Sequence, residues 1–390
     1  MAEQELFAEA ERAFGQRFGR RASLAASAPG RVNLIGEHTD YNEGLVLPCA
    51  IDRATLVLAA PRDDGRVRVF SLAQQAESTF ALDALSRTGD WADYVRAPAF
   101  ALREAGHRVR GAELAIASDV PVGAGLSSSA ALGIATTLAL AGISEIALPA
   151  RAVADLAHRG ESHFAGIGCG ILDQYASALG ERDRALRIDC RDRSVAALPL
   201  PANAIWLVAD TGAQRELARG GYRERVAECA AALAEAKHSG IAAPEASALR
   251  DLTPAALPGL ARALPEKLLL RARHVITENA RVDAFAAALG AGDLASAGAL
   301  MRASHASLRD DYAVSTPALD LLCELGDAAL GCAGSRLTGA GFGGCTLHLV
   351  EEGAAPDVSR ALETGFAASF GYAPRVWRVR ASDGARVLSV

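Results

Sequence analysis

The sequence predicts an α+β fold, in which strands and helices share one chain without a strict β-α-β alternation. Its 390 residues are enough for two or three domains, and 51% hydrophobic with 22% charged residues is typical of a globular protein. Strand-like segments mix with helices in the first half, Ala- and Arg-rich helical segments follow from about residue 215, and strand character returns near the C-terminus. This order favours α+β over a doubly wound α/β fold.

Each predicted element follows from a local pattern. Apolar runs rich in β-branched residues predict strands, over 45–61, 66–72, 111–121, 185–201, 204–212, 344–352 and 375–382. Apolar residues at helical spacing predict helices, over 131–143, 149–164, 222–238, 268–289 and 293–311. Residues 242–265 are rich in Pro and Ala without clear periodicity, so we expect a surface excursion, either disordered or bound to the surface.

Charge and composition exclude several classes of partner. The net charge is −6 without a basic cluster, which argues against nucleic acid. The N-terminus is acidic and helical in pattern, unlike a secretory signal, and no run of 18 apolar residues is present to span a membrane. Seven scattered cysteines without a C-x-x-C pair indicate neither a zinc site nor a disulfide framework. We therefore expect a cytoplasmic protein that is a monomer or a weak dimer.

The segment "PGRVNLIGEHTDYNEG", residues 29–44, places several charges beside one short apolar run. These are Arg31, Glu37, His38, Asp40 and Glu43. Buried charges are costly unless they are paired or given a ligand. The charges therefore favour a site for a polar ligand, although turn residues exposed to solvent would also fit, and Glu43 in particular reads as surface.

The segment "VPVGAGLSSSAALGIATT", residues 120–137, has strand residues before it and a helix after it. Gly123 and Gly125 allow the backbone to approach a bound group, and the serines open a helix whose N-terminus favours an anion. A tight turn with a serine cap is the alternative. There is no lysine, so a phosphate site here is not a Walker P-loop.

A second glycine-rich segment, "LTGAGFGGC" at residues 337–345, formally satisfies G-x-G-x-x-G. The residues that follow it read as a strand rather than a helix, so a dinucleotide-binding Rossmann motif is excluded by context. A glycine hairpin between two strands stays open as an interpretation.

A third candidate lies in "RGESHFAGIGCGILDQYASALG", residues 159–180. Glu161 and Asp173 stand in an apolar frame, separated by glycines that rule out one continuous helix. Asp173 is suited to accept a hydroxyl proton and Glu161 to hold a divalent cation, whereas capping of the next helix would equally explain Asp173.

Taken together, these motifs resemble the GHMP small-molecule kinases, and within them the galactokinase family. "GRVNLIGEHTDYNEG" is similar to the family signature, "VPVGAGLSSSAAL" to its phosphate loop and "LTGAGFGGC" to its third motif; segments such as "CGILDQYAS" extend the resemblance over nearly the whole chain. The resemblance implies two α+β domains. Residues 1–205 would resemble the ribosomal protein S5 domain 2-like fold and residues 206–390 a ferredoxin-like fold, with the active site in the cleft between them.

The resemblance also implies a reaction, the transfer of the γ-phosphoryl group of ATP to the C1 hydroxyl of galactose, the first step of galactose catabolism. Asp173 would lie against that hydroxyl with Arg31 beside it, acting by orientation and charge rather than by full proton abstraction. The residues implied to bind the sugar are Glu37, His38, Asp40, Gly170, Asp173 and Tyr222. Of these, Tyr222 is equally explained as a buried ring at a helix start.

For the nucleotide, the resemblance implies contacts from both glycine-rich loops and from Trp91 near the adenine, although a core position would also explain this tryptophan. The loop residues are Gly123, Gly125, Leu126, Ser127, Ser128, Ser129, Gly339 and Gly341. The implied cofactor is Mg²⁺ bridging the β- and γ-phosphates, with Ser129 and Glu161 as its protein contacts.

Two other functions remain open from the sequence. One is a kinase for another sugar with the same chemistry at carbon 1, such as N-acetylgalactosamine, arabinose or galacturonate. The other is a regulator that binds galactose and ATP without catalysis, which the complete serine loop and the presence of Arg31 and Asp173 disfavour.

Overall fold

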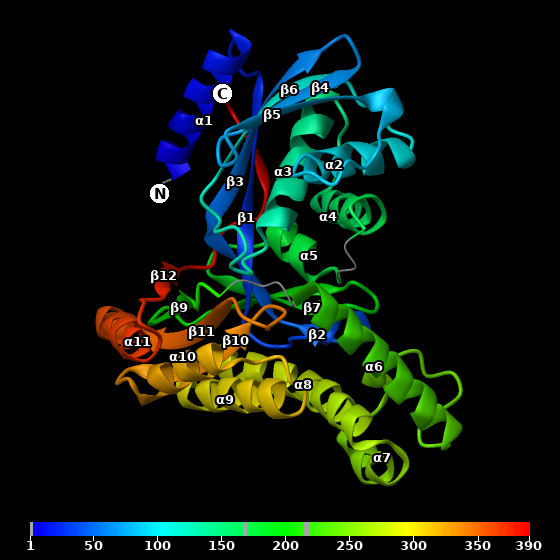
Figure 1. Ribbon diagram of the computed structural model, residues 1–390, viewed down its shortest axis with the longest axis vertical. Helices are drawn as coiled ribbons and strands as arrows, with labels where there is room; N and C mark the ends of the chain where they lie inside the picture. Colours follow the sequence, from blue (N-terminus) through cyan, green and yellow to red (C-terminus); the bar gives the residue numbers. More distant parts are fainter. Residues whose placement is uncertain (1–2, 167–169, 214–217) are drawn as a thin grey trace.

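The structure is a computed structural model that describes residues 3–166, 170–213 and 218–390, with the side chains of residues 218 and 219 left out. Figure 1 shows two stacked parts, one sheet with its helices above and a second sheet with the longer helices below. Within the described residues, the upper sheet has six strands and the lower sheet has four. The predicted α+β class is confirmed, because antiparallel pairing dominates both sheets and helices gather on their faces.

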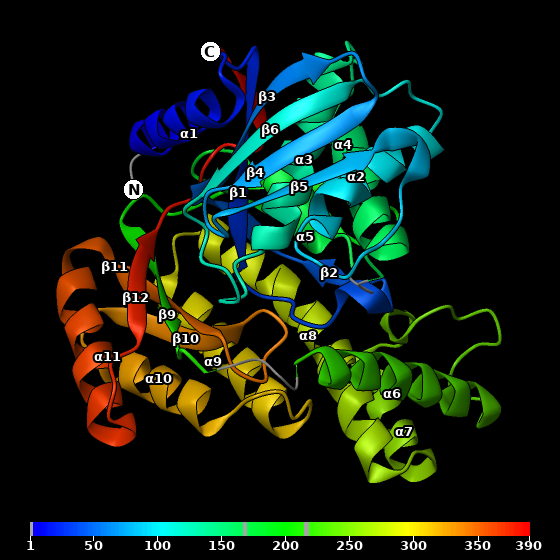
Figure 2. The same cartoon turned by 45° about the horizontal axis from the view of Figure 1, so that its top comes forward.

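The upper sheet has the strand order β13-β1-β3-β6-β4-β5. Its strands are β1 (Leu24–Asn33), β3 (Pro48–Arg62), β4 (Arg66–Ser71), β5 (Ala76–Ala81), β6 (Gly111–Ser118) and β13 (Arg386–Leu388). One face is covered by α1 (Glu3–Phe18), and the other by α2 (Asp93–Glu104), α3 (Ser128–Ile143), α4 (Ala150–Arg159) and α5 (Leu172–Leu179) (Figure 2). Alternation along β3 explains both layers: Leu56 and Leu58 pack with α1, whereas Val57 and Ala59 pack with the other helices.

The lower sheet has the order β10-β11-β9-β12 and is antiparallel throughout. Its strands are β9 (Ala204–Asp210), β10 (Cys332–Thr338), β11 (Cys345–Glu351) and β12 (Arg375–Val379). The accompanying helices are α6 (Ala218–His238), α7 (Leu257–Ala263), α8 (Glu266–Gly290), α9 (Leu294–Asp310), α10 (Pro317–Ala328) and α11 (Ala355–Phe370). This order and connectivity is the predicted ferredoxin-like β-α-β-β-α-β arrangement with a long helical insertion between β9 and β10.

One of the buried apolar clusters contains residues from both parts. Val32 and Leu34, at the end of β1, belong to the same buried cluster as Trp206 of β9 and Phe285 of α8. A small sheet of β2 (Leu45–Val46), β7 (Arg184–Asp189) and β8 (Val195–Pro199) lies beside this junction. The predicted boundary between residues 205 and 206 falls inside β9, and β13 returns to pair with β1 in the upper sheet. A two-domain division with the last strand assigned to the first domain is therefore our proposal.

Other elements differ from expectation in instructive ways. Residues 242–265 are neither disordered nor loosely bound: Leu249, Leu252 and Leu260 are buried in a cluster with α6 and α8. Helix α2 was not predicted from the sequence, because Pro98 lies inside it and proline is unfavourable within a helix. Among the described residues no helix combines the length and apolarity needed to cross a bilayer.

Candidate active site

Arg31 lies at an irregularity in the pairing of β1 with β3, and its side chain contacts two segments that are distant in the sequence. The register between β1 and β3 shifts just before Arg31, and the Arg31 backbone N–H donates to the Leu126 carbonyl at 3.1 Å. A Cβ at Gly30 would lie 2.7 Å from that same carbonyl oxygen, so the close approach requires glycine. The guanidinium donates from Nε to Asp173 Oδ1 at 2.7 Å and from Nη1 to the Gly125 carbonyl at 2.6 Å. One side chain thus joins the serine loop to the candidate acceptor carboxylate.

The serine loop has the backbone of an anion-binding turn. Gly123 and Gly125 have φ values of +79° and +83°, and Ser127 itself is left-handed at +58°, directly before α3 begins at Ser128. The Ser127 hydroxyl is buried without a hydrogen-bond partner among the described residues. The predicted glycines and serines therefore lie together at the positive end of a 16-residue helix, whereas the Leu126 side chain is buried in the core.

The two predicted metal contacts touch each other. Glu161 lies in a short π-helix, Gly160–Phe164, a local widening of the helix that often marks functional positions. Its buried carboxylate accepts hydrogen bonds from the Ser129 hydroxyl and from Gln174 Nε2, the latter at 2.7 Å. Burial, together with the nearby charge of Asp173, raises the pKa of Glu161. A cation placed here would relieve both effects.

Glu37 is held by donors from the third motif. Its Oε1 accepts from the Gly339 backbone N–H at 2.6 Å and from the Thr338 hydroxyl at 3.2 Å, while Oε2 accepts from Asn33 Nδ2 at 2.8 Å. The side chain is only 7% exposed. The carboxylate is therefore fixed by hydrogen bonds, with acceptor capacity left on Oε2.

His38 forms part of a chain of polar groups. Burial lowers the pKa of His38 to about 3, so the ring is neutral. Its Nε2 lies 3.1 Å from the Ala340 carbonyl, which only accepts, so the proton is assigned to Nε2 and the Tyr41 hydroxyl donates to Nδ1 at 2.9 Å. Tyr312 lies 2.7 Å from the Tyr41 hydroxyl. Because both ring nitrogens are engaged, His38 would have to exchange one of these bonds to contact a sugar.

Asp40 and Gly170 are in direct contact. A Cβ at Gly170 would lie 1.9 Å from Asp40 Oδ2, so glycine is the residue that leaves room for this carboxylate. Burial, and then the charges of Asp173 and Glu37, raises the pKa of Asp40 to about 7. Tyr222 faces the same region, with its ring centroid 5.9 Å from that of His38.

The third motif connects the other two. Besides its bonds to Glu37 and His38, it reaches the serine loop through the Cys345 thiol, which donates to the Ala124 carbonyl at 2.9 Å. The Thr211 backbone N–H, just after β9, donates to the Gly344 carbonyl at 2.9 Å. Residues of the segment 29–44, the serine loop and the third motif therefore form one candidate site where the upper and lower parts meet.

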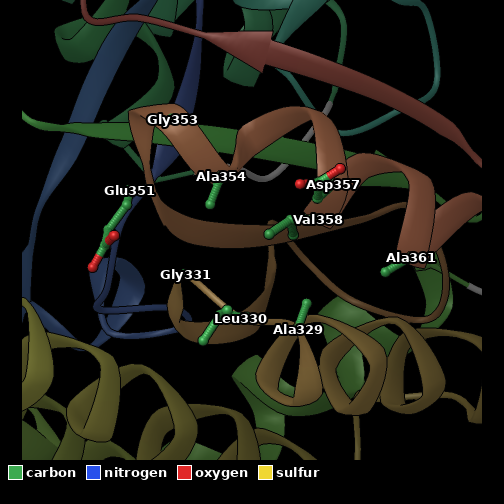
Figure 3. Close-up of a pocket in the computed structure, with 9 residues that line it drawn as sticks. All are labelled: Ala329, Leu330, Gly331, Glu351, Gly353, Ala354, Asp357, Val358 and Ala361. Atoms are coloured by element: carbon green, nitrogen blue, oxygen red, sulfur yellow. The ribbon is translucent and has the colours of Figure 1, made fainter.

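Trp91 packs beside the core of the upper part, directly before α2. A separate hollow lies between α10, the end of β11 and α11; its lining includes Leu330, Glu351 and Asp357 (Figure 3). Of the described residues that line it, none is among those predicted to bind sugar, nucleotide or metal.

Two residues near Glu37 and Tyr41, namely Arg336 and Tyr312, were not predicted from the sequence. Arg336 is fully buried, donates from Nη1 to the Asn33 carbonyl at 3.0 Å and lies 3.5 Å from Glu37 Oε1. A charged residue inside an apolar strand, directly before the third motif, is the feature that could have indicated it. The contact between Tyr312 and Tyr41 could not be predicted from the sequence, because 271 residues separate the two tyrosines.

Comparison with known proteins identifies the family. The galactokinase galactose-binding signature matches residues 12–61, the GHMP kinases N terminal domain matches 93–181 and the GHMP kinases C terminal model matches 285–368. A galactokinase of Roseiflexus sp. (strain RS-1) is 46% identical over 372 residues, or 95% of this chain and 94% of that protein. The chain belongs to the galactokinase family of GHMP kinases.

Further galactokinases agree with this assignment. The protein of Chloroflexus aurantiacus (strain ATCC 29366 / DSM 635 / J-10-fl) is 48% identical over 340 residues, covering 87% of this chain and 86% of that protein. The crystal structure of Lactococcus lactis galactokinase complexed with galactose matches with a TM-score of 0.93 and 32% identity, over 98% of this chain and 99% of that one. The predicted two-part GHMP fold is confirmed.

The raised pKa of Asp40 predicts a pH-dependent penalty on stability. Between the ordinary value of 3.8 and about 7, the folded protein keeps a proton that the unfolded chain has released, so the stabilising contribution of Asp40 is lost as pH rises through this window. The Asp40→Asn variant cannot ionise and should gain stability relative to the wild type between about pH 5 and about pH 8. Urea unfolding of both proteins without sugar measures this difference; an equal difference at both pH values would contradict the assignment.

Proposed function

We propose that this protein transfers the γ-phosphoryl group of ATP to the C1 hydroxyl of galactose, giving galactose 1-phosphate and ADP. The observation that carries the proposal is the double contact of Arg31, which binds the Asp173 carboxylate and a carbonyl of the serine loop with one guanidinium. Phosphoryl transfer depends mainly on alignment and charge stabilisation, and this contact supplies both. The galactokinase relatives and the likeness to a galactose complex support the choice of substrate.

At the acceptor end, Asp173 accepts the hydrogen bond of the C1 hydroxyl and orients its oxygen toward the phosphate. Its side chain is 29% exposed, whereas that of Arg31 is 8% exposed, so the carboxylate is the more accessible member of the pair. Arg31 balances charge that develops on the transferred group. Glu37, His38, Asp40 and Tyr222 bind the hydroxyls away from carbon 1, His38 by exchanging one of its two ring hydrogen bonds. Gly170 leaves the space that Asp40 needs.

At the donor end, the serine loop and the N-terminus of α3 receive the phosphates. The buried and unpartnered Ser127 hydroxyl and the left-handed turns at Gly123 and Gly125 suit a phosphate oxygen. Ser128 begins the helix, and the backbones of Leu126, Gly339 and Gly341 line the adjoining turns. Trp91 is proposed to lie beside the adenine.

The residues present also fit Mg²⁺. This ion prefers oxygen ligands and usually keeps several waters, binding through one or two protein groups together with substrate phosphates. The pair formed by the Ser129 hydroxyl and the buried Glu161 carboxylate matches this pattern, and the described residues hold no larger cluster of His, Cys, Asp and Glu that would form a closed site. When bound, the ion would neutralise charge on the β- and γ-phosphates.

We further propose a cytoplasmic location, supported by free thiols at all six cysteines that the structure describes; Cys169 lies outside the described residues. For the oligomeric state we propose a monomer or a weak dimer.

The direct test is ADP release by the purified protein with Mg-ATP and a panel of sugars: galactose, N-acetylgalactosamine, glucose, arabinose and galacturonate. We expect fast release that is selective for galactose. Release with a different sugar would keep the mechanism and change the substrate. If galactose raises the melting temperature of the protein but no ADP is released, the protein is a sensor rather than a kinase.

The metal assignment predicts a specific loss in Glu161→Gln and Ser129→Ala. Both variants should need about 10- to 100-fold more free Mg²⁺ for half-maximal rate, because each removes a group at the ion's position. Titration of the initial rate with Mg²⁺ at fixed ATP measures this shift.

The matched control is Ser162→Ala, on the same π-helix, whose hydroxyl lies 3.3 Å from His158 Nε2. This variant should keep the wild-type Mg²⁺ dependence. If Glu161→Gln also keeps it, Glu161 does not bind the ion.

A further inference from the structure

The third motif, residues 337–345, carries one aromatic side chain, Phe342, and the backbone fixes the direction of this side chain. Phe342 has a left-handed φ of +57°, unusual for an aromatic residue, and its N–H donates to the Val314 carbonyl at 2.7 Å. A Cβ at the neighbouring Gly341 would lie 2.3 Å from the same Val314 oxygen. The motif is therefore pressed against the turn that follows α9, which leaves the Phe342 ring little freedom to change direction.

The ring meets helix α6 at a glycine. A Cβ at Gly221 would lie 2.3 Å from Phe342 Cζ and 2.5 Å from Cε2, distances that real side chains do not adopt. The adjacent Gly220 is exposed, and a Cβ there would have nothing within 4 Å. Helix α6 thus approaches the ring more closely than any other residue at position 221 would permit.

A second contact fastens the same helix to the same region. Arg225, one turn after Gly221, is buried and lies 5.8 Å from the centroid of the Phe342 ring. It donates from Nε to the Tyr312 carbonyl at 2.7 Å and from Nη2 to the Ala313 carbonyl at 3.1 Å. The start of α6, the third motif and the turn after α9 are therefore joined by direct contacts.

The residue that follows Gly221 is Tyr222, which faces two residues of the matched galactose-binding signature. Its ring centroid lies 5.1 Å from that of Tyr41 and 5.9 Å from that of His38. The motif that carries Phe342 also donates the Gly339 N–H to Glu37. One loop consequently contacts two of the groups proposed to bind the sugar, Glu37 directly and Tyr222 through Gly221.

We infer that Phe342 is a positioning residue for the sugar. Its ring, seated on Gly221, places Tyr222 beside the rings of His38 and Tyr41, so the Phe342–Gly221 contact determines the affinity for the sugar more than the rate of the chemical step. This inference rests on the proposed function.

The test compares two neighbouring glycines of α6. Alanine gains the same helix propensity at both positions, so a difference between Gly221→Ala and Gly220→Ala isolates the contact with the ring. We expect Gly221→Ala to raise KM for galactose about tenfold, because the helix must shift to admit the methyl group, with kcat and KM for ATP changed much less. Gly220→Ala should keep the wild-type KM.

A double mutant then identifies the ring as the cause. Phe342→Ala should itself raise KM for galactose, and adding Gly221→Ala to it should produce no further rise, because the clash is gone. If the alanine variant does not fold, Phe342→Leu replaces it, because leucine keeps apolar volume but lacks the Cε and Cζ atoms that face Gly221.

The outcomes separate the two proposals. Equal KM values for Gly221→Ala and Gly220→Ala in an active enzyme, or additive effects in the double mutant, would overturn the role of Phe342 and leave the kinase intact. Absence of ADP release from the wild type with every sugar would instead overturn the proposed function, and the inference with it.

Discussion

The arrangement of this site depends on the guanidinium of Arg31. Its side chain is only 8% exposed, so its charge has been taken largely out of water and requires partners. It has two, the Asp173 carboxylate and the Gly125 carbonyl, which belong to segments far apart in the sequence. Removing the Asp173 carboxylate would leave a mostly buried charge uncompensated. The double contact also fixes the spacing between Asp173 and the serine loop.

The part of the site that contains Glu37 and Asp40 is built differently, from carboxylates whose charges repel one another. Burial, and then the nearby charges of Asp173 and Glu37, raises the pKa of Asp40 to about 7. Burial keeps His38 neutral, and hydrogen bonds from the third motif hold Glu37 in place. Such a cluster costs stability, and under the proposed function it supplies acceptors for the sugar hydroxyls, a common compromise at functional sites.

Much of this could be predicted from the sequence, because the informative signals are local. Strand β3 follows from a long apolar run, and the two glycine-rich loops follow from glycines at positions that do have positive φ values. The residues assigned to the phosphates and to the metal do lie together, since neighbouring motifs bring them there.

The remainder depends on contacts between distant parts of the chain. Strand β13 is three residues long, and its pairing with β1 joins the two ends of the protein. Arg336 donates a hydrogen bond to the Asn33 carbonyl, 303 residues away in the sequence. The ring of Phe342 packs against Gly221, which lies in helix α6. No local pattern encodes such partners. Residues 242–265 read as loose because their leucines gain a core only when α6 and α8 are in place.

The measurement that tests this account most directly is a double-mutant cycle on kcat/KM with Arg31→Lys, Asp173→Asn and the combined variant. Lysine keeps the charge of Arg31 but cannot reach two partners in the same fixed geometry. If the pair acts as a unit, each single variant should lose several kcal/mol of transition-state stabilisation, and the combined variant should lose little more than either. Losses that add in full, with all variants folded, would show that the two residues act independently and would contradict the account.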